Sequence, residues 1–145
     1  MTLGVVCIDA NFVVGLLIDD IPESHFERLW IQWQDLGATA VAPALIYYEV
    51  SNAFHRLTIA GELLPEEANQ LLNEGLNLNI TLYGDVELHR EAFILARSLK
   101  LSATYDSHYL ALAQRLGCEF WTADKRLFNS VQASLAWIHL VTSSS

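Results

Sequence analysis

Four acidic residues stand where a folded chain can bring their carboxylates together. Asp9 follows the short apolar run GVVCI, Asp124 follows the run EFWT, and Asp106 stands in the first turn of a segment with helical spacing. Glu49 falls on or beside the apolar stripe of another helical segment, where a carboxylate needs a partner. Because the chain has only 8 basic residues, a cation shared among the four carboxylates is the economical partner.

Carboxylates grouped in this way are typical ligands of hard divalent cations. Mg²⁺ and Mn²⁺ take oxygen ligands and are commonly held by a few carboxylates together with substrate phosphates. Such a centre hydrolyses phosphodiester bonds by activating a water and neutralising charge on the transferring phosphorus. Crowded carboxylates should also raise the pKa of at least one of them in the metal-free protein.

Each acid also has an ordinary structural interpretation. Asp106 and Asp124 are each in the right place for a helix cap, which stabilises a helix by ~1 kcal/mol. Asp9 can start a turn with Asn11, and Glu49 can bend towards the surface. The functional interpretation depends on all four acids meeting at one rim of the fold.

The apolar runs and their spacing predict the elements that would position these acids. Strands are expected at GVVCID, TAVAP, ITLYG, EFWT and AWIHLV. Helices are expected over residues 22–37, 44–61, 85–101 and 107–117, with others starting at Pro65 and just after Asp124. This alternation favours a three-layer α/β/α fold with a central, mainly parallel sheet of about five strands, and ligands beyond the carboxyl ends of the strands.

The composition limits the class of protein and its partners. The 145 residues fit one ordinary domain, and although 52% are apolar, no run approaches the ~18 residues of a membrane span. We therefore expect a cytoplasmic protein without a signal sequence, in which Cys7 and Cys118 are buried rather than bridged or bound to zinc. The net charge of −9 is the wrong sign for coating nucleic acid, so any contact with nucleic acid must be local.

Four acid-bearing segments resemble the PIN-domain ribonucleases, and within them the VapC-type toxins of toxin–antitoxin pairs. The segments are IDANFVV with Asp9 and Asn11, YYEVSNAF with Glu49, and TYDSHYLALAQRLGCEFWTADKRLF with Asp106, Thr122 and Asp124. The combination of YD..YLALA with WTAD.RL at this separation is fairly specific. The likeness covers essentially the entire chain.

The resemblance implies a Mg²⁺- or Mn²⁺-dependent endoribonuclease, often a homodimer, whose acidic pocket a cognate antitoxin protein blocks. It implies a single PIN-like nuclease domain over residues 1–145, and residues 141–145 are expected to form a flexible tail. By this likeness four residues are catalytic and bind the metal directly or through water, with two supporting polar groups: Asp9, Glu49, Asp106 and Asp124, supported by Asn11 and Thr122.

Basic side chains near these acids are candidate contacts for the RNA substrate. Arg56 shares the helical segment of Glu49, while Lys125 and Arg126 directly follow Asp124. Each is equally well explained as a solvated surface group. His108 stands where the family frequently has a small apolar residue; it is a candidate substrate contact, although we favour an exposed, structural histidine.

Other classes of protein fit the acids less well. A phosphatase with an aspartate nucleophile needs a second acid two residues after the first, and Asn11 occupies that position. A phosphate-accepting receiver domain needs a central strand that ends in aspartate, and ITLYG does not. A PIN-like module that binds RNA or protein without cutting remains the alternative to the nuclease.

Overall fold

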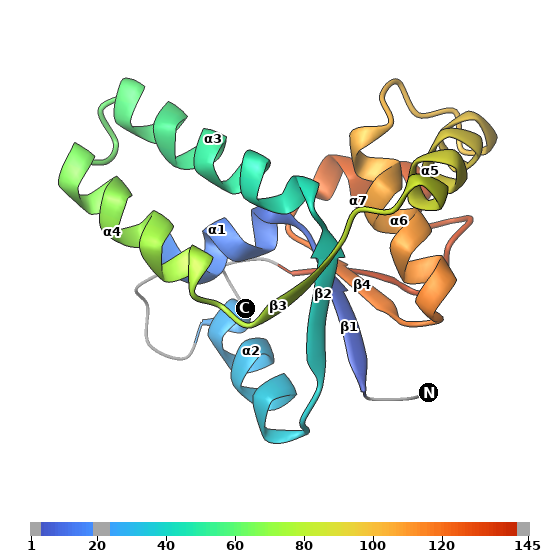
Figure 1. The fold of residues 1–145 in the computed structure, drawn as a ribbon, viewed down its shortest axis with the longest axis horizontal. Coiled ribbons are helices and arrows are strands. Elements are labelled where there is room, and N and C mark those ends of the chain that lie inside the picture. Colours follow the sequence, from blue (N-terminus) through green and yellow to red (C-terminus); the bar gives the residue numbers. More distant parts are fainter. Residues whose placement is uncertain (1–3, 19–23, 142–145) are drawn as a thin grey trace.

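The computed structural model describes residues 4–18 and 24–141, in which a five-stranded sheet is covered by helices on both faces (Figure 1). All strand pairs are parallel, and the strand order is β3-β2-β1-β4-β5. The strands are β1 (Val5–Ile8), β2 (Thr39–Pro43), β3 (Ile80–Tyr83), β4 (Glu119–Thr122) and β5 (Ile138–Leu140). The predicted three-layer α/β/α class with a parallel sheet is confirmed.

The helices divide between the two faces according to the direction in which the chain moves across the sheet. From β1 to β3 it moves one way, and the crossovers place α1 (Ala10–Ile18), α2 (His25–Asp35), α3 (Leu45–Ile59) and α4 (Pro65–Leu76) on one face. It then moves the other way, so α5 (Val86–Ser98), α6 (Tyr105–Leu116) and α7 (Lys125–Val131) cover the second face. Right-handed crossovers between parallel strands require this division.

The helix α1 was not predicted, and its start lies directly after Asp9. Its sequence, ANFVVGLLI, is apolar at almost every position, so it lacks the polar interruptions from which helical spacing is recognised. Gly15 shows how closely α1 meets α2, because a Cβ at Gly15 would lie 2.4 Å from the Phe26 ring. The helix predicted over residues 22–37 begins at His25, and residues 22–23 lie outside the described part of the chain.

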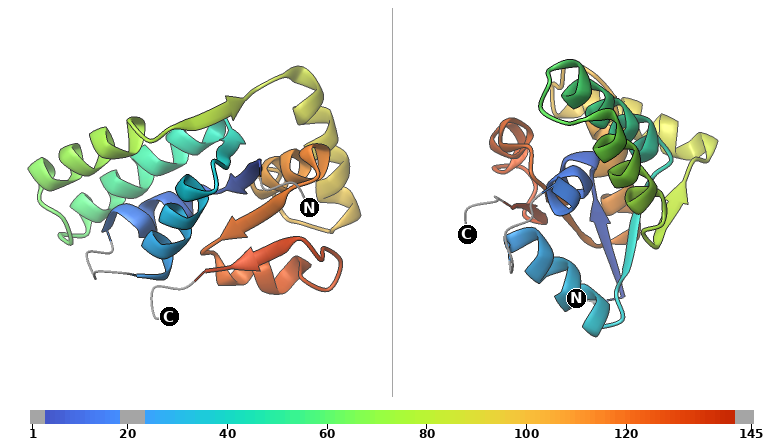
Figure 2. Two further views of the ribbon diagram at one scale, coloured as in Figure 1. Left: turned by 90° about the horizontal axis from the view of Figure 1, so that it is seen from below. Right: turned by 90° about the vertical axis from the view of Figure 1, so that its left-hand side faces the viewer.

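The central strands are buried on both faces. Cys7 and Ile8 of β1 and Phe120 of β4 are fully buried, as expected for parallel strands between two helical layers. Cys7 and Cys118 are both free thiols, and both are buried as predicted. Helices α3 and α4 lie side by side and extend beyond the sheet (Figures 1 and 2). Within the described residues, no helix is both long enough and apolar enough to cross a membrane.

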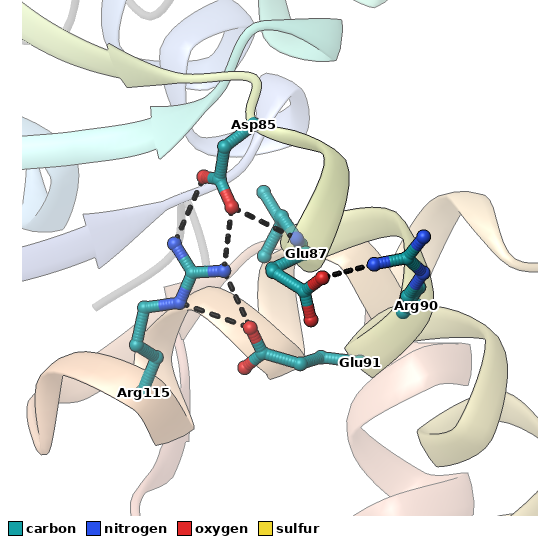
Figure 3. Close-up of polar contacts among 6 residues, drawn as sticks. Asp85, Glu87, Arg90, Glu91 and Arg115 are labelled. Carbon is teal, nitrogen blue, oxygen red and sulfur yellow. Dashed lines mark hydrogen bonds and ion pairs between the residues drawn. The ribbon is translucent and has the colours of Figure 1, made fainter.

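An arginine fastens α6 to the start of α5 (Figure 3). Arg115, in the last turn of α6, donates two parallel hydrogen bonds of 2.9 and 3.0 Å to Asp85, the N-terminal cap of α5. It also donates to Glu91, from Nε at 3.1 Å. The hydrogen bonds from Arg115 lower the pKa of Asp85 from 3.8 to about 2. Because such two-pronged pairs fix orientation as well as distance, this contact sets how α6 lies against α5.

We predict that Arg115→Met lowers the melting temperature by a few degrees, whereas Arg90→Met changes it very little. Both arginines appear in Figure 3, but Arg90 pairs with Glu87 one turn away on the exposed surface of α5. Since the pKa of Asp85 is lowered by folding, its stabilising effect is present above its ordinary pKa of 3.8 and is lost as the pH falls towards 2.

Thermal unfolding of the three proteins between pH 2 and pH 7 measures this effect. The difference between wild type and Arg115→Met should shrink as the pH falls through that window. A difference that stays constant from pH 7 to pH 2 would show that the contact to Asp85 does not contribute.

Candidate active site

Asp9 and Thr122 meet at the point where the strand order reverses. The chain leaves β1 in one direction and β4 in the other, which opens a crevice at the carboxyl ends of these neighbouring strands. The Thr122 hydroxyl donates a 2.5 Å hydrogen bond to Oδ2 of Asp9, and the backbone N–H of Asp124 donates to the Thr122 hydroxyl at 2.9 Å. Thr122 therefore links the two aspartates, and its supporting role in a metal site stays a prediction.

Asp9 is a buried carboxylate, only 5% exposed. Its Oδ1 accepts a hydrogen bond of 2.9 Å from the backbone N–H of Phe12, in the first turn of α1. The turn expected after Asp9 is thus the start of a helix. Asp9 can cap α1 and still bind a metal ion, because each hydrogen bond occupies only one of the lone pairs on its carboxylate oxygen.

Asp106 and Asp124 differ in how they relate to their helices. Asp124 is the N-terminal cap of α7, and its Oδ1 accepts hydrogen bonds from the backbone N–H groups of Arg126 and Leu127 at 3.0 and 3.1 Å. Thr104 is the cap residue of α6, so the capping interpretation of Asp106 is wrong. Asp106 instead lies half-buried within the first turn of α6.

Glu49 on α3 has a partner that sequence reasoning missed. The Tyr109 hydroxyl of α6 donates a 2.5 Å hydrogen bond to Oε1 of Glu49, across 60 positions of the chain. Tyr109 itself is 1% exposed, and its ring stacks on Phe120 with centroids 6.0 Å apart. The sequence does hold one indication that Tyr109 belongs to the site, because it follows Asp106 by three residues and so lies on the same side of the helix.

Three of the four predicted acids open into one pocket of about 210 Å³, here called the acidic pocket. Its lining residues come from the start of α1, from α3 and from α6: Asp9, Ala10, Asn11, Glu49, Asn52, Ala53, Arg56, Asp106 and Tyr109. Asn52 was also missed, although it follows Glu49 by one helical turn. Asp124 does not line the pocket but lies close enough to raise the pKa of both Asp9 and Asp106.

The carboxylates of the acidic pocket are hard to ionise in the metal-free protein. Burial, together with smaller contributions from the charges of Asp106 and Asp124, raises the pKa of Asp9 from 3.8 to about 7 against the opposing hydrogen bonds from Thr122 and Phe12. The pKa values of Glu49 and Asp106 are raised as well, in each case mainly by burial. The expected rise is therefore present, but burial contributes more to it than the crowding of like charges.

The donor set of the acidic pocket fits a hard divalent cation. Its potential ligands are carboxylate, amide and hydroxyl oxygens, with no thiol or imidazole among the lining residues. In the described part of the chain, no three His, Cys, Asp or Glu side chains already stand close enough to hold an ion. The mutual repulsion among Asp9, Asp106 and Asp124 is nevertheless what a bound cation would relieve.

The predicted basic contacts take different positions around the acidic pocket. Arg56 lines it, on the exposed side of α3. Lys125 and Arg126 are exposed in the first turn of α7, outside the residues that line the pocket. His108 faces a neighbouring pocket, in hydrogen-bonding contact with His89.

Comparison with known proteins agrees with this fold. A family model described as PIN domain matches residues 6–133. Ribonuclease VapC3 of Pyrobaculum aerophilum is 30% identical over 123 residues, which cover 83% of this chain and 89% of the relative. Ribonuclease VapC9 of Mycobacterium tuberculosis is 31% identical over 131 residues, covering 88% and 92%. The chain therefore belongs to the PIN-domain family, and within it to the VapC ribonucleases.

Solved structures show the same fold at lower sequence identity. The crystal structure of PAE2754 from Pyrobaculum aerophilum superposes with a TM-score of 0.67 at 21% identity, covering 91% of this chain and 90% of the other. Mycobacterium tuberculosis VapC20, a toxin that cleaves the sarcin–ricin loop, superposes with a TM-score of 0.61 at 12% identity, covering 90% and 95%. At these identities the likeness extends to the fold alone.

We predict that Asp9→Asn makes the metal-free protein more stable than wild type at pH 8, by up to about 4 kcal/mol. The pKa of Asp9 is about 7 in the folded protein and 3.8 ordinarily, so folding favours the protonated form and wild type loses stability as the pH rises between these values. The asparagine variant lacks this loss, and the two proteins should converge near pH 4.

Urea unfolding in the presence of a chelator, from pH 4 to pH 8, measures this difference. Asp35→Asn is the matched control, since its carboxylate is exposed at the end of α2. Parallel stability curves for wild type and Asp9→Asn would contradict the raised pKa of Asp9.

We also predict that Tyr109→Phe weakens Mn²⁺ binding by roughly 10- to 100-fold, because groups that orient metal ligands have effects of that size. Phenylalanine keeps the ring that stacks on Phe120 and removes only the hydroxyl that holds Glu49. Tyr47→Phe is the control. Tyr47 lies on α3, the helix of Glu49, but its hydroxyl donates to the Gly75 carbonyl and not to Glu49. Titration calorimetry giving equal Mn²⁺ affinity for Tyr109→Phe and wild type would rule out this orienting role.

Proposed function

We propose that the chain is an endoribonuclease that hydrolyses phosphodiester bonds of RNA at the acidic pocket, as the toxin of a toxin–antitoxin pair. The observation that carries this proposal is the meeting of Asp9, Glu49 and Asp106 in one pocket at the carboxyl edge of the sheet, with Asp124 beside it. Membership of the VapC ribonucleases supports RNA as the substrate.

The four acids are proposed to hold Mg²⁺ or Mn²⁺, directly or through water. When bound, the ion supplies positive charge beside the phosphate and lowers the pKa of a coordinated water. The chain supplies the orientation of the ligands. Thr122 holds one oxygen of Asp9, the Phe12 amide holds the other, and Tyr109 holds one oxygen of Glu49. Ligands fixed in this way lose little conformational freedom when the ion binds.

Substrate contacts are proposed for the polar groups at the rim of the acidic pocket. The guanidinium of Arg56 is suited to two oxygens of one phosphate, since its donors form a planar fork. Asn11 and Asn52 line the same pocket with neutral amides that can donate to a phosphate or contact a 2′-hydroxyl. Lys125 and Arg126 are proposed to contact more distant phosphates, because they lie outside the pocket lining.

The remaining proposals concern the assembly and its setting. We propose that residues 1–145 form one nuclease domain in the cytoplasm, that it associates as a homodimer, and that a cognate antitoxin protein occupies the acidic pocket. The likeness to VapC toxins supports these proposals. The acidic pocket itself supports the proposal about the antitoxin. The pKa values of its carboxylates are raised, so a basic side chain of another protein would stabilise their charged forms and compete with the metal ion for them.

We predict that Asp106→Asn lowers the rate of RNA cleavage by at least about 100-fold, since a site of this kind depends on each ligand of its ion. Purified protein is incubated with a mixed pool of RNA and Mg²⁺ or Mn²⁺, and with a chelator in a parallel reaction. Asp106 is half-buried and caps no helix, so its replacement should leave the fold intact. Asp35→Asn controls for the loss of one exposed negative charge.

Two outcomes of this experiment would count against the proposal. Cleavage that survives chelation, or that Asp106→Asn retains, would place the activity outside the acidic pocket. The lack of cleavage by folded, metal-loaded wild type would favour a PIN-like module that binds RNA or protein without cutting.

A further inference from the structure

A second pocket of about 360 Å³ lies beside the acidic pocket, and we call it the aromatic pocket. The residues of its lining that matter here are Tyr48, Tyr83, Tyr105, Leu88, His89 and His108. None of its lining residues is Asp, Glu, Lys or Arg. Its volume lies within the ~300–1,000 Å³ of small-ligand sites, and its surface is neutral in a chain of net charge −9.

The two pockets share their helices. On α3, Tyr48 of the aromatic pocket directly precedes Glu49 of the acidic pocket. On α6, Tyr105 directly precedes Asp106 in the same way. Neighbouring residues on a helix point in directions about 100° apart, so each helix serves both pockets with adjacent faces.

The aromatic pocket also continues the edge of the sheet on which the acidic pocket lies. Pro43 and Tyr83 both line it, and they are paired in register at the carboxyl ends of β2 and β3. Asp9 follows β1, the next strand along this edge. From β1 to β3 is two strand spacings, or about 10 Å. A ligand that extends from the acidic pocket along this edge therefore reaches the aromatic pocket.

Two tyrosines of the aromatic pocket have exposed rings. Tyr48 is 76% exposed and Tyr105 is 61% exposed, so both present ring surface to solvent. A phosphate would find no cation in the lining, and a charged peptide side chain would find no counter-charge. The part of a nucleotide that is flat and uncharged is its base, and unstacked RNA bases bind by stacking on aromatic rings.

Two histidines add polar groups to the lining of the aromatic pocket. Nδ1 of His108 lies 2.6 Å from the Thr104 carbonyl, which can only accept, so this nitrogen carries the proton. Nε2 of His108 lies 2.9 Å from Nδ1 of His89, so one of these nitrogens donates to the other. Nε2 of His89 takes no part in this contact, and an imidazole nitrogen can hydrogen-bond to a polar group on the edge of a base.

We propose that the aromatic pocket binds the base of a nucleotide adjacent to the scissile phosphate of single-stranded RNA, with Tyr48 and Tyr105 as stacking surfaces. This inference rests on the proposed ribonuclease function and adds a base-binding subsite to it. Stacking tolerates every base, whereas a hydrogen bond with His89 discriminates among the edges of the bases. Recognition here needs no positive charge.

The test compares variants on RNA substrates that differ by a single base. The substrates are short oligoribonucleotides that span a cleavage site mapped with wild type in the mixed RNA pool. One is intact, and the others carry an abasic ribose at each position beside the scissile phosphate. The proteins are wild type, Tyr48→Leu, Tyr105→Leu, the conservative Tyr48→Phe, and Phe93→Leu as an exposed aromatic residue outside the pocket lining.

On the intact substrate, each leucine variant should raise KM by roughly 5- to 100-fold, with kcat within about twofold of wild type, because stacking contributes to ground-state and transition-state binding alike. At one abasic position this difference should disappear, since the base that stacks is missing. Tyr48→Phe should retain most of the affinity, and Phe93→Leu should behave as wild type.

Three results would overturn the inference. Leucine variants that match wild type on the intact substrate would show that no base binds there. A loss that persists on every abasic substrate would assign the effect to folding or general RNA binding. Conversion of a dimer to a monomer by Tyr105→Leu in sedimentation, without a base-dependent loss, would make the pocket an interface between copies. If wild type cleaves no RNA, the proposed ribonuclease function itself is wrong. That outcome is seen with wild type alone and does not depend on the leucine variants.

Discussion

The hydrogen bond from Thr122 to Asp9 joins the ends of the two strands between which the site is built. Burying a carboxylate is costly, and here its two oxygens are held by a threonine hydroxyl from β4 and by the first turn of α1. Because α1 starts directly after Asp9 and α7 starts directly after Asp124, this one junction sets the origin of a helix on each face of the sheet. The remaining site residues are placed relative to it.

Helix α6 connects the acidic pocket to the rest of the fold. It carries Asp106 and Tyr109 on the side that faces the acidic pocket, one turn apart. Between them, Ser107 is fully buried on the opposite side and donates to the Ala92 carbonyl of α5 at 2.8 Å. Arg115 fastens the far end of the helix. Since α6 is held at both ends against α5, the position of Asp106 depends on contacts remote from the site.

The strands and the acids that follow them were predictable, because burial between two helical layers requires short apolar runs that end at one edge. The helix α1 was not, since a helix that is apolar all round has no stripe to recognise. Within the site, the sequence indicated Glu49 but not Tyr109, which meets it from another helix 60 positions away. A contact of that kind depends on the crossing of α3 and α6, which local spacing does not encode.

The formal charge of −9 overstates the repulsion that an RNA phosphate meets at this edge of the sheet. The raised pKa values of Asp9, Glu49 and Asp106 mean that these groups release their protons reluctantly without a cation, and with one their charge is neutralised. Arg56 adds a positive charge at the rim, and the aromatic pocket carries none of either sign. On the proposed function, an acidic chain can therefore hold RNA locally, through an ion at the scissile phosphate and uncharged contacts beside it.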